Sequence, residues 1–183
     1  MAWFRDRVRH AGRGEEGFTL IELLAALSIL LVGILGVAAT LQKTREAVSI
    51  AEVRETAVYR AEREIERLRS LPYASLALAG MPASSPDQSD PAFYVQGTQY
   101  QWDSGNAASV APLVTGGAIA PRTTWTDGRL SGTLQVYVTT FVDTVAGTPQ
   151  AKRLIVGVTV SGRYALNRPT IVSTVVHQPP VTP

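Results

Sequence analysis

Residues 17–41 read GFTLIELLAALSILLVGILGVAATL and decide the fold of this chain. Between Phe18 and Leu41 the only ionisable side chain is that of Glu22. A helix of this length, at about 1.5 Å per residue, spans the roughly 30 Å hydrocarbon layer of a bilayer. The segment therefore predicts one membrane pass, and a carboxylate inside such a helix requires a specific explanation.

The flanking charges predict the orientation of this pass. Residues 1–17 contain Arg5, Arg7, Arg9 and Arg13, and the positive-inside tendency places such a basic leader in the cytoplasm. Everything after Leu41 would then be extracytoplasmic. We therefore expect a single-pass protein of the cytoplasmic (inner) membrane.

The charge outside the leader is almost balanced. Of the 17 Lys and Arg and 15 Asp and Glu side chains, four basic and three acidic ones lie in residues 1–17, which leaves 13 against 12 in the remainder. No dense basic block lies beyond residue 17, so nucleic-acid binding is not indicated. The chain has no cysteine, which excludes disulfides and thiol catalysis but does not define the compartment.

Residues 42–71 continue the helix with an amphipathic composition. Neither Gly nor Pro occurs between residues 37 and 71, so nothing interrupts a helix that begins in the apolar run. Apolar side chains recur at helical spacing among charged ones and predict one buried stripe. That stripe comprises Val48, Ala51, Val58, Ala61, Ile65 and Leu68. Pro72 ends the pattern because it has no amide donor, so we expect one helix from Phe18 to about Leu71.

Beyond residue 72 the periodicity becomes that of strands. Residues 72–91 and 103–121 are rich in turn-forming residues and are interpreted as loops, the first packed loosely on the helix. Val, Thr, Tyr and Ile dominate four segments, at 93–102, 132–142, 153–161 and 170–177. In the third segment Leu154, Val156, Val158 and Val160 share one face. We expect an antiparallel sheet with one covered face, and the amphipathic stripe as its cover.

The predicted fold class is therefore α+β. A long N-terminal helix, half transmembrane and half amphipathic, packs on a small C-terminal antiparallel β-sheet. The expected organisation is a cytoplasmic leader at 1–17, a transmembrane helix half at 18–41, an amphipathic half at 42–71 and an extracytoplasmic β-rich head at 72–183.

These features resemble the type IV pilin superfamily, which comprises major pilins, minor pilins and the pseudopilins of type II protein secretion. The segment GFTLIELLAALSIL at 17–30 is similar, residue by residue, to the processing motif of that superfamily. The segment KRLIVGVTV at 152–160 resembles a strand of minor pilins and pseudopilins. From Pro72 onward only the architecture is otherwise similar, and the missing cysteines depart from the many pilins that carry a disulfide.

The resemblance implies a prepilin that is processed and assembled. A prepilin peptidase would cleave between Gly17 and Phe18 and methylate the new amine of Phe18. Glu22 would act in filament assembly, where the positive Phe18 amine of a neighbouring subunit offsets the cost of the carboxylate in lipid. The implied partners are the peptidase, other pilin or pseudopilin subunits, the inner-membrane assembly machinery and the membrane itself. A pilus at the cell surface, or a pseudopilus, is the implied product.

Alternative interpretations remain open for the same residues. Glu22 lies only about 6 Å past Phe18 along a helix, so it also fits the headgroup level. Val37-Ala38-Ala39 offers the small residues of a secretory signal-peptide cleavage site, although such signals have shorter apolar regions. Gly33 and Gly36 fit a helix–helix contact, a loosened helix or mere tolerance in lipid.

Catalysis, cofactors and metals are not expected. His10 lies in the leader, His177 stands alone, and no nucleophile–base pair or phosphate-binding glycine loop occurs. The acidic residues Asp87, Asp90, Asp103, Asp127 and Asp143 lack the spacing of a calcium loop.

Two functional classes are left. We favour a pilin-like filament subunit, and a minor pilin or pseudopilin over a major pilin. The alternative is a membrane-tethered extracytoplasmic protein that binds a surface, a sugar or DNA and does not polymerise.

Overall fold

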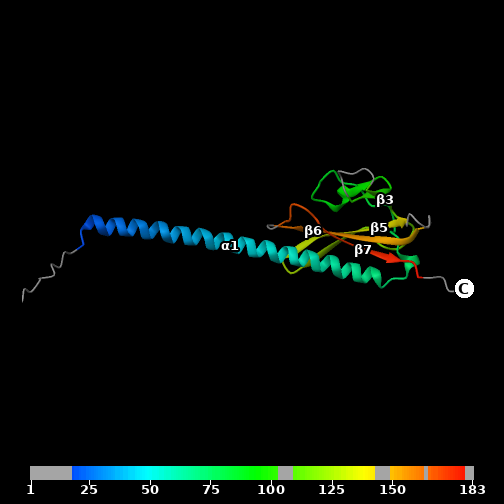
Figure 1. Cartoon of the computed structure of the whole chain (residues 1–183), viewed down its shortest axis with the longest axis horizontal. Helices are drawn as coiled ribbons and strands as arrows, with labels where there is room; N and C mark the ends of the chain where they lie inside the picture. The colour runs from blue at the N-terminus through cyan, green and yellow to red at the C-terminus, as the bar shows by residue number, and fades with distance from the viewer. Residues whose placement is uncertain (1–17, 103–108, 143–148, 163–164, 180–183) are drawn as a thin grey trace, which may run out of the picture. The chain divides into compact units, whose positions relative to one another are not determined.

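A computed structural model of the chain describes residues 18–102, 109–142, 149–162 and 165–179. The chain divides into two compact units, Met1–Arg45 and Glu46–Pro183. The described part of the chain contains one long helix, two short 3₁₀ helices and seven strands (Figure 1). The first unit contributes the apolar part of the helix, and the second contributes the rest of the helix and all the strands.

Helix α1 runs from Leu20–Arg69, 50 residues without interruption. The prediction of a single helix through the apolar and amphipathic segments is confirmed. The helix is two residues shorter at each end than predicted. Arg67 and Arg69 lie in its last turn, where cations interact favourably with the helix dipole, and Pro72 follows closely.

The buried stripe of α1 was predicted correctly only in its last two turns. Ala61, Ile65 and Leu68 are buried, whereas Val48 and Val58 are 52% and 38% exposed and Ala51 is also exposed. Val53 and Ala57 take their place, because steps of four residues continue the line of Ala61 and Ile65 toward the N-terminus. Two lines of apolar side chains run along this helix, and the one through Val53, Ala57, Ala61 and Ile65 is buried.

Four antiparallel strands form the main sheet, and they confirm the α+β prediction. They are β4 Arg122–Asp127, β5 Leu130–Val142, β6 Pro149–Ser161 and β7 Thr170–His177, in the order β4-β5-β6-β7. The sequence analysis identified the last three but missed β4. Gly128, at φ 55°, forms the tight turn between β4 and β5, and a non-glycine residue adopts that conformation only with strain.

A second sheet corrects two predictions. Residues 93–102 were expected to form one strand but instead comprise the end of the 3₁₀ helix η2 (Pro91–Tyr94) and a hairpin of β1 (Val95–Gln96) and β2 (Gln99–Gln101). Gly97, at φ 58°, makes the turn that splits the expected strand. Strand β3 (Val110–Pro112) pairs with β2 and lies in a segment that was predicted to be loop.

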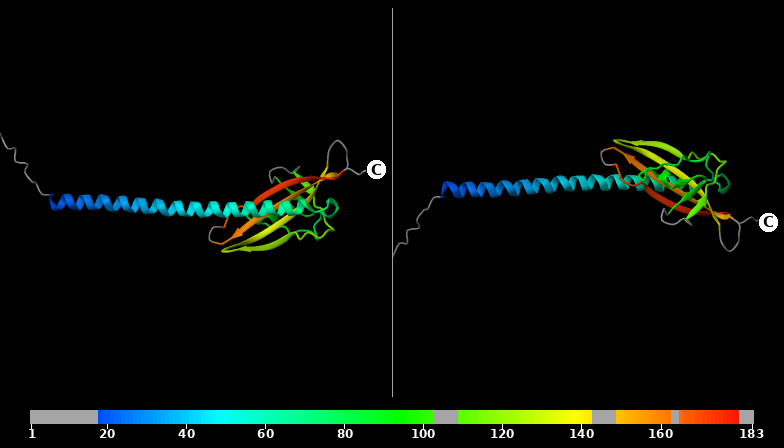
Figure 2. Two further views of the ribbon diagram at one scale, coloured as in Figure 1. Left: turned by 90° about the horizontal axis from the view of Figure 1, so that it is seen from below. Right: turned by 90° about the horizontal axis from the view of Figure 1, so that it is seen from above.

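The main sheet is covered on both faces, so the prediction of one covered face is wrong. On one face Leu154, Val156 and Val158 are completely buried with the stripe of α1. On the other face Ile155 is also buried, and the Tyr137 ring lies 4.8 Å from that of Tyr100 in β2. Figures 1 and 2 show the resulting layers, with the C-terminal part of α1 and the small sheet on opposite sides of β5 and β6.

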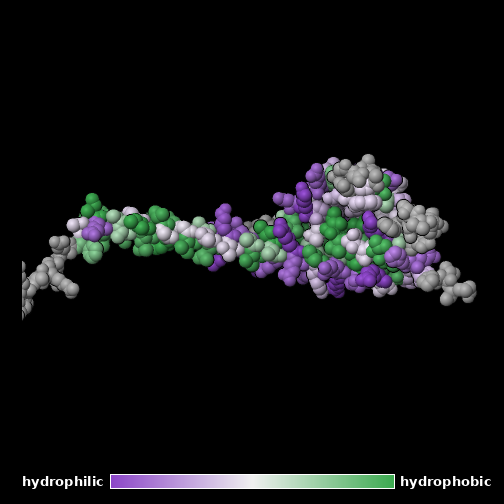
Figure 3. All heavy atoms as spheres, viewed as in Figure 1, coloured by the Kyte–Doolittle hydropathy of each residue, from purple (hydrophilic) through white to green (hydrophobic). Residues whose placement is uncertain are grey.

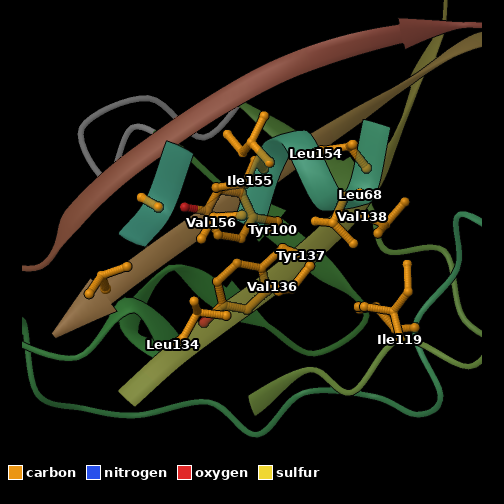
Figure 4. Packing of buried hydrophobic residues seen from close by; sticks show 14 of the residues in the cluster. Leu68, Tyr100, Ile119, Leu134, Val136, Tyr137, Val138, Leu154, Ile155 and Val156 are labelled. Atoms are coloured by element: carbon orange, nitrogen blue, oxygen red, sulfur yellow. The ribbon is translucent and has the colours of Figure 1, made fainter. Parts of the chain in front are cut away.

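The segment after α1 is part of the core, which contradicts the prediction of a loosely packed loop. Leu76 and Leu78 are completely buried, beyond the 3₁₀ helix η1 (Tyr73–Ser75). The Lys152 ammonium fixes this segment by donating to the carbonyl oxygens of Tyr73 and Leu76 at 2.9 and 2.8 Å. Desolvation at this position lowers the pKa of Lys152. Figure 4 shows side chains of this cluster from α1 and from both sheets, and the cluster also includes Leu76 and Leu78.

A polar network joins the Tyr137 face of the main sheet, called the second face below, to the 3₁₀ helix η2 that covers it. The Gln135 amide donates to Asp90 Oδ1 at 2.5 Å, and the Tyr137 hydroxyl donates to Gln135 Oε1. Asp90 Oδ1 also accepts a hydrogen bond from the backbone N–H of Ala92 at 2.9 Å, which caps η2. Buried polar groups must be paired, so this network holds η2 in one position on the sheet.

Alkaline pH is expected to destabilise the head through two buried tyrosines. Burial is the first cause that raises the pKa of both Tyr100 and Tyr137 above the usual value of 10.0. A raised folded-state pKa contributes stability that is fully present below about pH 10 and is lost as the pH rises further, by about 1.4 kcal/mol per pH unit and tyrosine. Denaturant midpoints between about pH 8 and pH 12 should show this loss.

Phenylalanine variants identify the groups responsible for the alkaline effect. Tyr100→Phe and Tyr137→Phe should each flatten the midpoint-against-pH curve, and the matched variant of the exposed Tyr59 should leave it unchanged. A parent curve that is level up to about pH 12 would contradict the expectation.

Candidate functional site

The start of α1 carries most of the residues that the sequence analysis singled out. Phe18 and Thr19 precede the helix, and the Phe18 side chain is 82% exposed. The Glu22 backbone N–H donates to Thr19 Oγ1 at 3.3 Å and to the Thr19 carbonyl oxygen at 3.0 Å. Thr19 is therefore the N-cap of α1. Gly17, the other residue of the predicted cleavage site, lies outside the described residues.

Thr19 is a helix-capping residue that the sequence analysis did not identify. Its signal was present, because Thr19 and Glu22 have the spacing of a capping box, in which Ser or Thr at the N-cap precedes Glu or Gln by three residues. Glu22 also lies in the first turn, where a negative charge interacts favourably with the helix dipole. Glu22 thus has a role in its own helix before any partner is considered.

The Glu22 carboxylate has no ion-pair partner among the residues that the structure describes. It is exposed, and its neighbours along the chain are the apolar Ile21, Leu23 and Leu24. A carboxylate in lipid costs about 2.5–3.5 kcal/mol at mid-bilayer, and less near the interface. A cation from outside this helix can offset that cost.

The N-terminal part of α1 presents an apolar surface on every side. Each residue from 18 to 41 is exposed, and large side chains such as Leu20 and Ile29 are 79% and 75% exposed. Among the described residues, α1 is the helix that is long and apolar enough to cross a membrane. Figure 3 shows this surface as a nearly continuous apolar stretch. A surface of this size requires lipid or other helices as cover, and the segment has the length and composition of a membrane anchor.

Gly33 and Gly36 face no other part of the described chain, so their three interpretations stay open. A Cβ atom added at either position would meet nothing within 4 Å, so packing inside this chain does not explain either glycine. Gly33 lies in a shallow apolar groove of the same helix, which also includes Leu30, Ile34 and Val37. The Thr40 hydroxyl donates a hydrogen bond to the Gly36 carbonyl oxygen at 2.9 Å. Its hydrogen-bond donor is therefore paired even in an apolar environment.

The acidic residues considered for calcium binding have structural roles where they are described. Asp87 Oδ1 accepts from the Ser89 N–H at 2.8 Å, Asp90 caps η2, and Asp127 pairs with Arg60 at 2.6 Å. Within the described ranges, no three His, Cys, Asp or Glu side chains are grouped as a metal site requires. Asp103 and Asp143 lie outside these ranges.

A groove of about 540 Å³ lies on the second face of the main sheet, beside β7. Trp102 is 44% exposed there, and the Arg153 guanidinium stacks 4.8 Å from its ring centroid. The lining consists of Tyr94, Tyr100, Trp102, Arg153, Ile155, Ile171, Ser173, Thr174 and Val175. Aromatic rings beside hydroxyl groups are typical of sites that hold small ligands.

Of the comparisons with known proteins, the one with family models matches the N-terminal segment. Searches of curated proteins and of solved structures found no match. Residues 12–38 match the family described as the prokaryotic N-terminal methylation motif. The matched range contains Gly17, Phe18, Thr19 and Glu22, together with most of the exposed apolar surface of α1. The chain thus carries, at the start of its long apolar helix, the methylation motif that is characteristic of the type IV pilin superfamily.

Proposed function

We propose that the chain is a type IV pilin-like filament subunit that is cleaved after Gly17, N-methylated on Phe18 and assembled by helix packing. The motif at residues 12–38 implies processing by a prepilin peptidase and assembly with other pilins. The observation that carries the proposal is the apolar surface of α1 up to Leu41, which is exposed throughout and whose one carboxylate is Glu22. In a filament, neighbouring helices cover that surface and a neighbouring Phe18 amine pairs with Glu22.

The proposed topology follows from the charge of the leader. Residues 1–17 stay in the cytoplasm, 18–41 span the inner membrane, and 42–71 with the head at 72–183 are extracytoplasmic. The inner-membrane assembly machinery then extracts the processed subunit into a pilus or pseudopilus. The subunit has a structural role and needs neither catalysis nor a cofactor.

A minor pilin or a pseudopilin is the preferred identity within this function. The similarity of residues 152–160 to a strand of these proteins supports it. In the structure this segment is the centre of β6, and its side chains at 154, 156 and 158 are completely buried.

The second candidate function is a membrane-tethered binding protein that does not polymerise. The groove between Trp102 and β7 favours it, because such a groove fits a small ligand such as a sugar. The two functions differ at Glu22, since a tether requires the apolar helix but not a carboxylate inside it.

Leader removal is the first test of the filament proposal. The chain is expressed in bacterial membranes with and without a prepilin peptidase, and the N-terminus is determined by mass spectrometry. With the peptidase, we expect a chain that begins at Phe18 and is heavier by one methyl group. An uncleaved leader, or a chain that begins after Ala39 as a secretory signal predicts, contradicts the proposal.

A pair of leader variants sharpens this test. Gly17→Leu places a side chain at the scissile bond, where the enzyme must approach the backbone closely, and should abolish cleavage. Gly14→Leu introduces the same side chain three residues earlier and should leave cleavage intact.

A further inference from the structure

A groove of about 630 Å³ lies between α1 and the segment that leads into β7. Ile50, Arg54 and Val58 line it from α1, at the four-residue spacing that places them along one side of the helix. The other lining residues are Ala165, Leu166, Asn167, Arg168, Pro169 and Thr170. Ile50 and Val58 are each 38% exposed, so the described part of the chain leaves apolar surface uncovered in this groove.

The groove carries two positive charges. Arg54 and Arg168 are exposed, and neither forms an ion pair with a residue that the structure describes. Among the described residues that line the groove, none is an aspartate or a glutamate. Guanidinium groups bind carboxylates in strong, charge-assisted hydrogen bonds. The groove therefore favours an occupant that carries carboxylates beside an apolar side chain.

Helix α1 presents a surface of this kind on another face. Glu55, Tyr59 and Glu62, called the acidic line below, are spaced by four and three residues and share one side of the helix. All three are exposed, Tyr59 by 61%, and neither carboxylate forms an ion pair with a described residue. Tyr59 lies two residues, or about 200° around the helix, from the buried Ala57 and Ala61. The acidic line therefore points away from the main sheet.

We propose that the groove binds the acidic line of a second copy of the chain, whose Glu55 and Glu62 pair with Arg54 and Arg168. The inference rests on the proposed function and deepens it by naming a contact between subunits. Groove and line are different surfaces, so the contact is heterologous and propagates in one direction, as a filament requires. Arg54 and the acidic line also belong to the same stretch of α1, so two copies that are anchored alike present them at the same distance from the membrane.

The contact is measured by cross-linking in membranes, which the absence of cysteine from the chain makes specific. One tagged copy carries Asn167→Cys in the groove, and a second, differently tagged copy carries Ala51→Cys, an exposed position one turn before Glu55. A short bismaleimide should join the two copies. Thr126→Cys replaces Asn167→Cys in the control, because Thr126 is exposed on β4 at the opposite edge of the sheet from β7, and it should give no product.

Charge reversal then tests the pairing itself. Arg54→Glu with Arg168→Glu on the groove copy should lower the cross-linked fraction about tenfold, because like charges then face each other across the interface. Glu55→Arg with Glu62→Arg on the other copy should do the same. When both copies are reversed, the opposite charges meet again and the cross-linked fraction should return close to the parental value.

Arg129→Glu on the groove copy is the matched control, because Arg129 is equally exposed, forms no ion pair with a described residue and lies outside this groove. It should leave the cross-linked fraction unchanged. Membrane-inserted chain is quantified for every variant, so that the fractions refer to equal amounts of each copy.

Three results overturn the inference. They are the absence of a cross-link between the parental copies, a cross-linked fraction that does not respond to charge reversal, and a loss on reversal of the groove that reversal of the acidic line neither reproduces nor repairs. The last result assigns the groove to another anionic occupant, such as a lipid headgroup. The proposed function fails separately, when the chain is not cleaved after Gly17, whereas a chain that is cleaved but gives no charge-dependent cross-link rejects this inference alone.

Discussion

Replacing Glu22 with alanine or leucine is expected to reduce incorporation into filaments at least tenfold while leaving membrane insertion intact. The carboxylate is the one charge on the apolar surface of α1, and none of the described residues forms an ion pair with it. An unpaired carboxylate costs about 2.5–3.5 kcal/mol in lipid, so a subunit amine that pairs with it there gives a strong preference for the correct register. Removal of the carboxylate removes that preference.

A glutamine variant separates the two roles of Glu22. Glutamine at this position keeps the capping-box spacing from Thr19 but carries no charge. If charge pairing drives assembly, Glu22→Gln is lost from filaments together with Glu22→Ala and Glu22→Leu. If the helix cap alone matters, Glu22→Gln is incorporated normally and the other two are not.

Incorporation is measured as the ratio of sheared filament to membrane-bound chain, in cells that express the assembly machinery, after the N-terminus of each variant has been determined. Unchanged incorporation of the Ala and Leu variants would reject the filament function and favour the tethered binding protein. Leu23→Ala is the matched control, since it changes a neighbouring exposed residue of the same turn without changing its charge.

Replacing Gly132 with alanine is expected to destabilise the head by about 3 kcal/mol or more. A Cβ at Gly132 would lie 1.9 Å from the Thr159 carbonyl oxygen and 2.9 Å from a ring carbon of Trp125. The first contact is with backbone of the neighbouring strand β6, which cannot rotate away as a flexible side chain does. The ring of Trp125 is held in turn, with the Arg60 guanidinium 5.0 Å from its centroid.

The stability measurement uses the full chain in detergent, unfolded by denaturant and followed by tryptophan fluorescence. Gly80→Ala is the control, because a Cβ at Gly80 meets nothing within 4 Å, and its midpoint should match that of the parent within error. Equal midpoints for the Gly132 and Gly80 variants would show that β5 and β6 can separate locally without cost, contrary to this packing.

The candidate site was readable from the sequence because its features are local. An apolar run with one carboxylate that follows Gly17 and Phe18 predicts the same helix whatever head domain follows it. Each of these residues acts through its neighbours in a single helix. Thr19 was overlooked although its spacing from Glu22 was visible. The capping role became evident only when the hydrogen bond to the Glu22 N–H was observed.

The head was only partly predictable, because its decisive contacts join distant residues. Strands β5, β6 and β7 alternate clearly, whereas β1, β2 and β3 have at most three residues each and carry little periodic signal. The second covered face depends on Tyr100 against Tyr137 and on Pro91 against Gly157. Neither pair is signalled by spacing along the chain.

By itself the sequence determined the anchor helix, the place of Glu22 and the α+β class, because hydrophobic periodicity and the absence of helix breakers are properties of neighbouring residues. Only the tertiary structure decided which line of α1 is buried, that the main sheet is covered twice, and that Gly132 must be a glycine. These outcomes depend on close packing between elements that are distant in the sequence. Which surfaces pack together is decided by their complementary shapes and not by the order of residues along the chain.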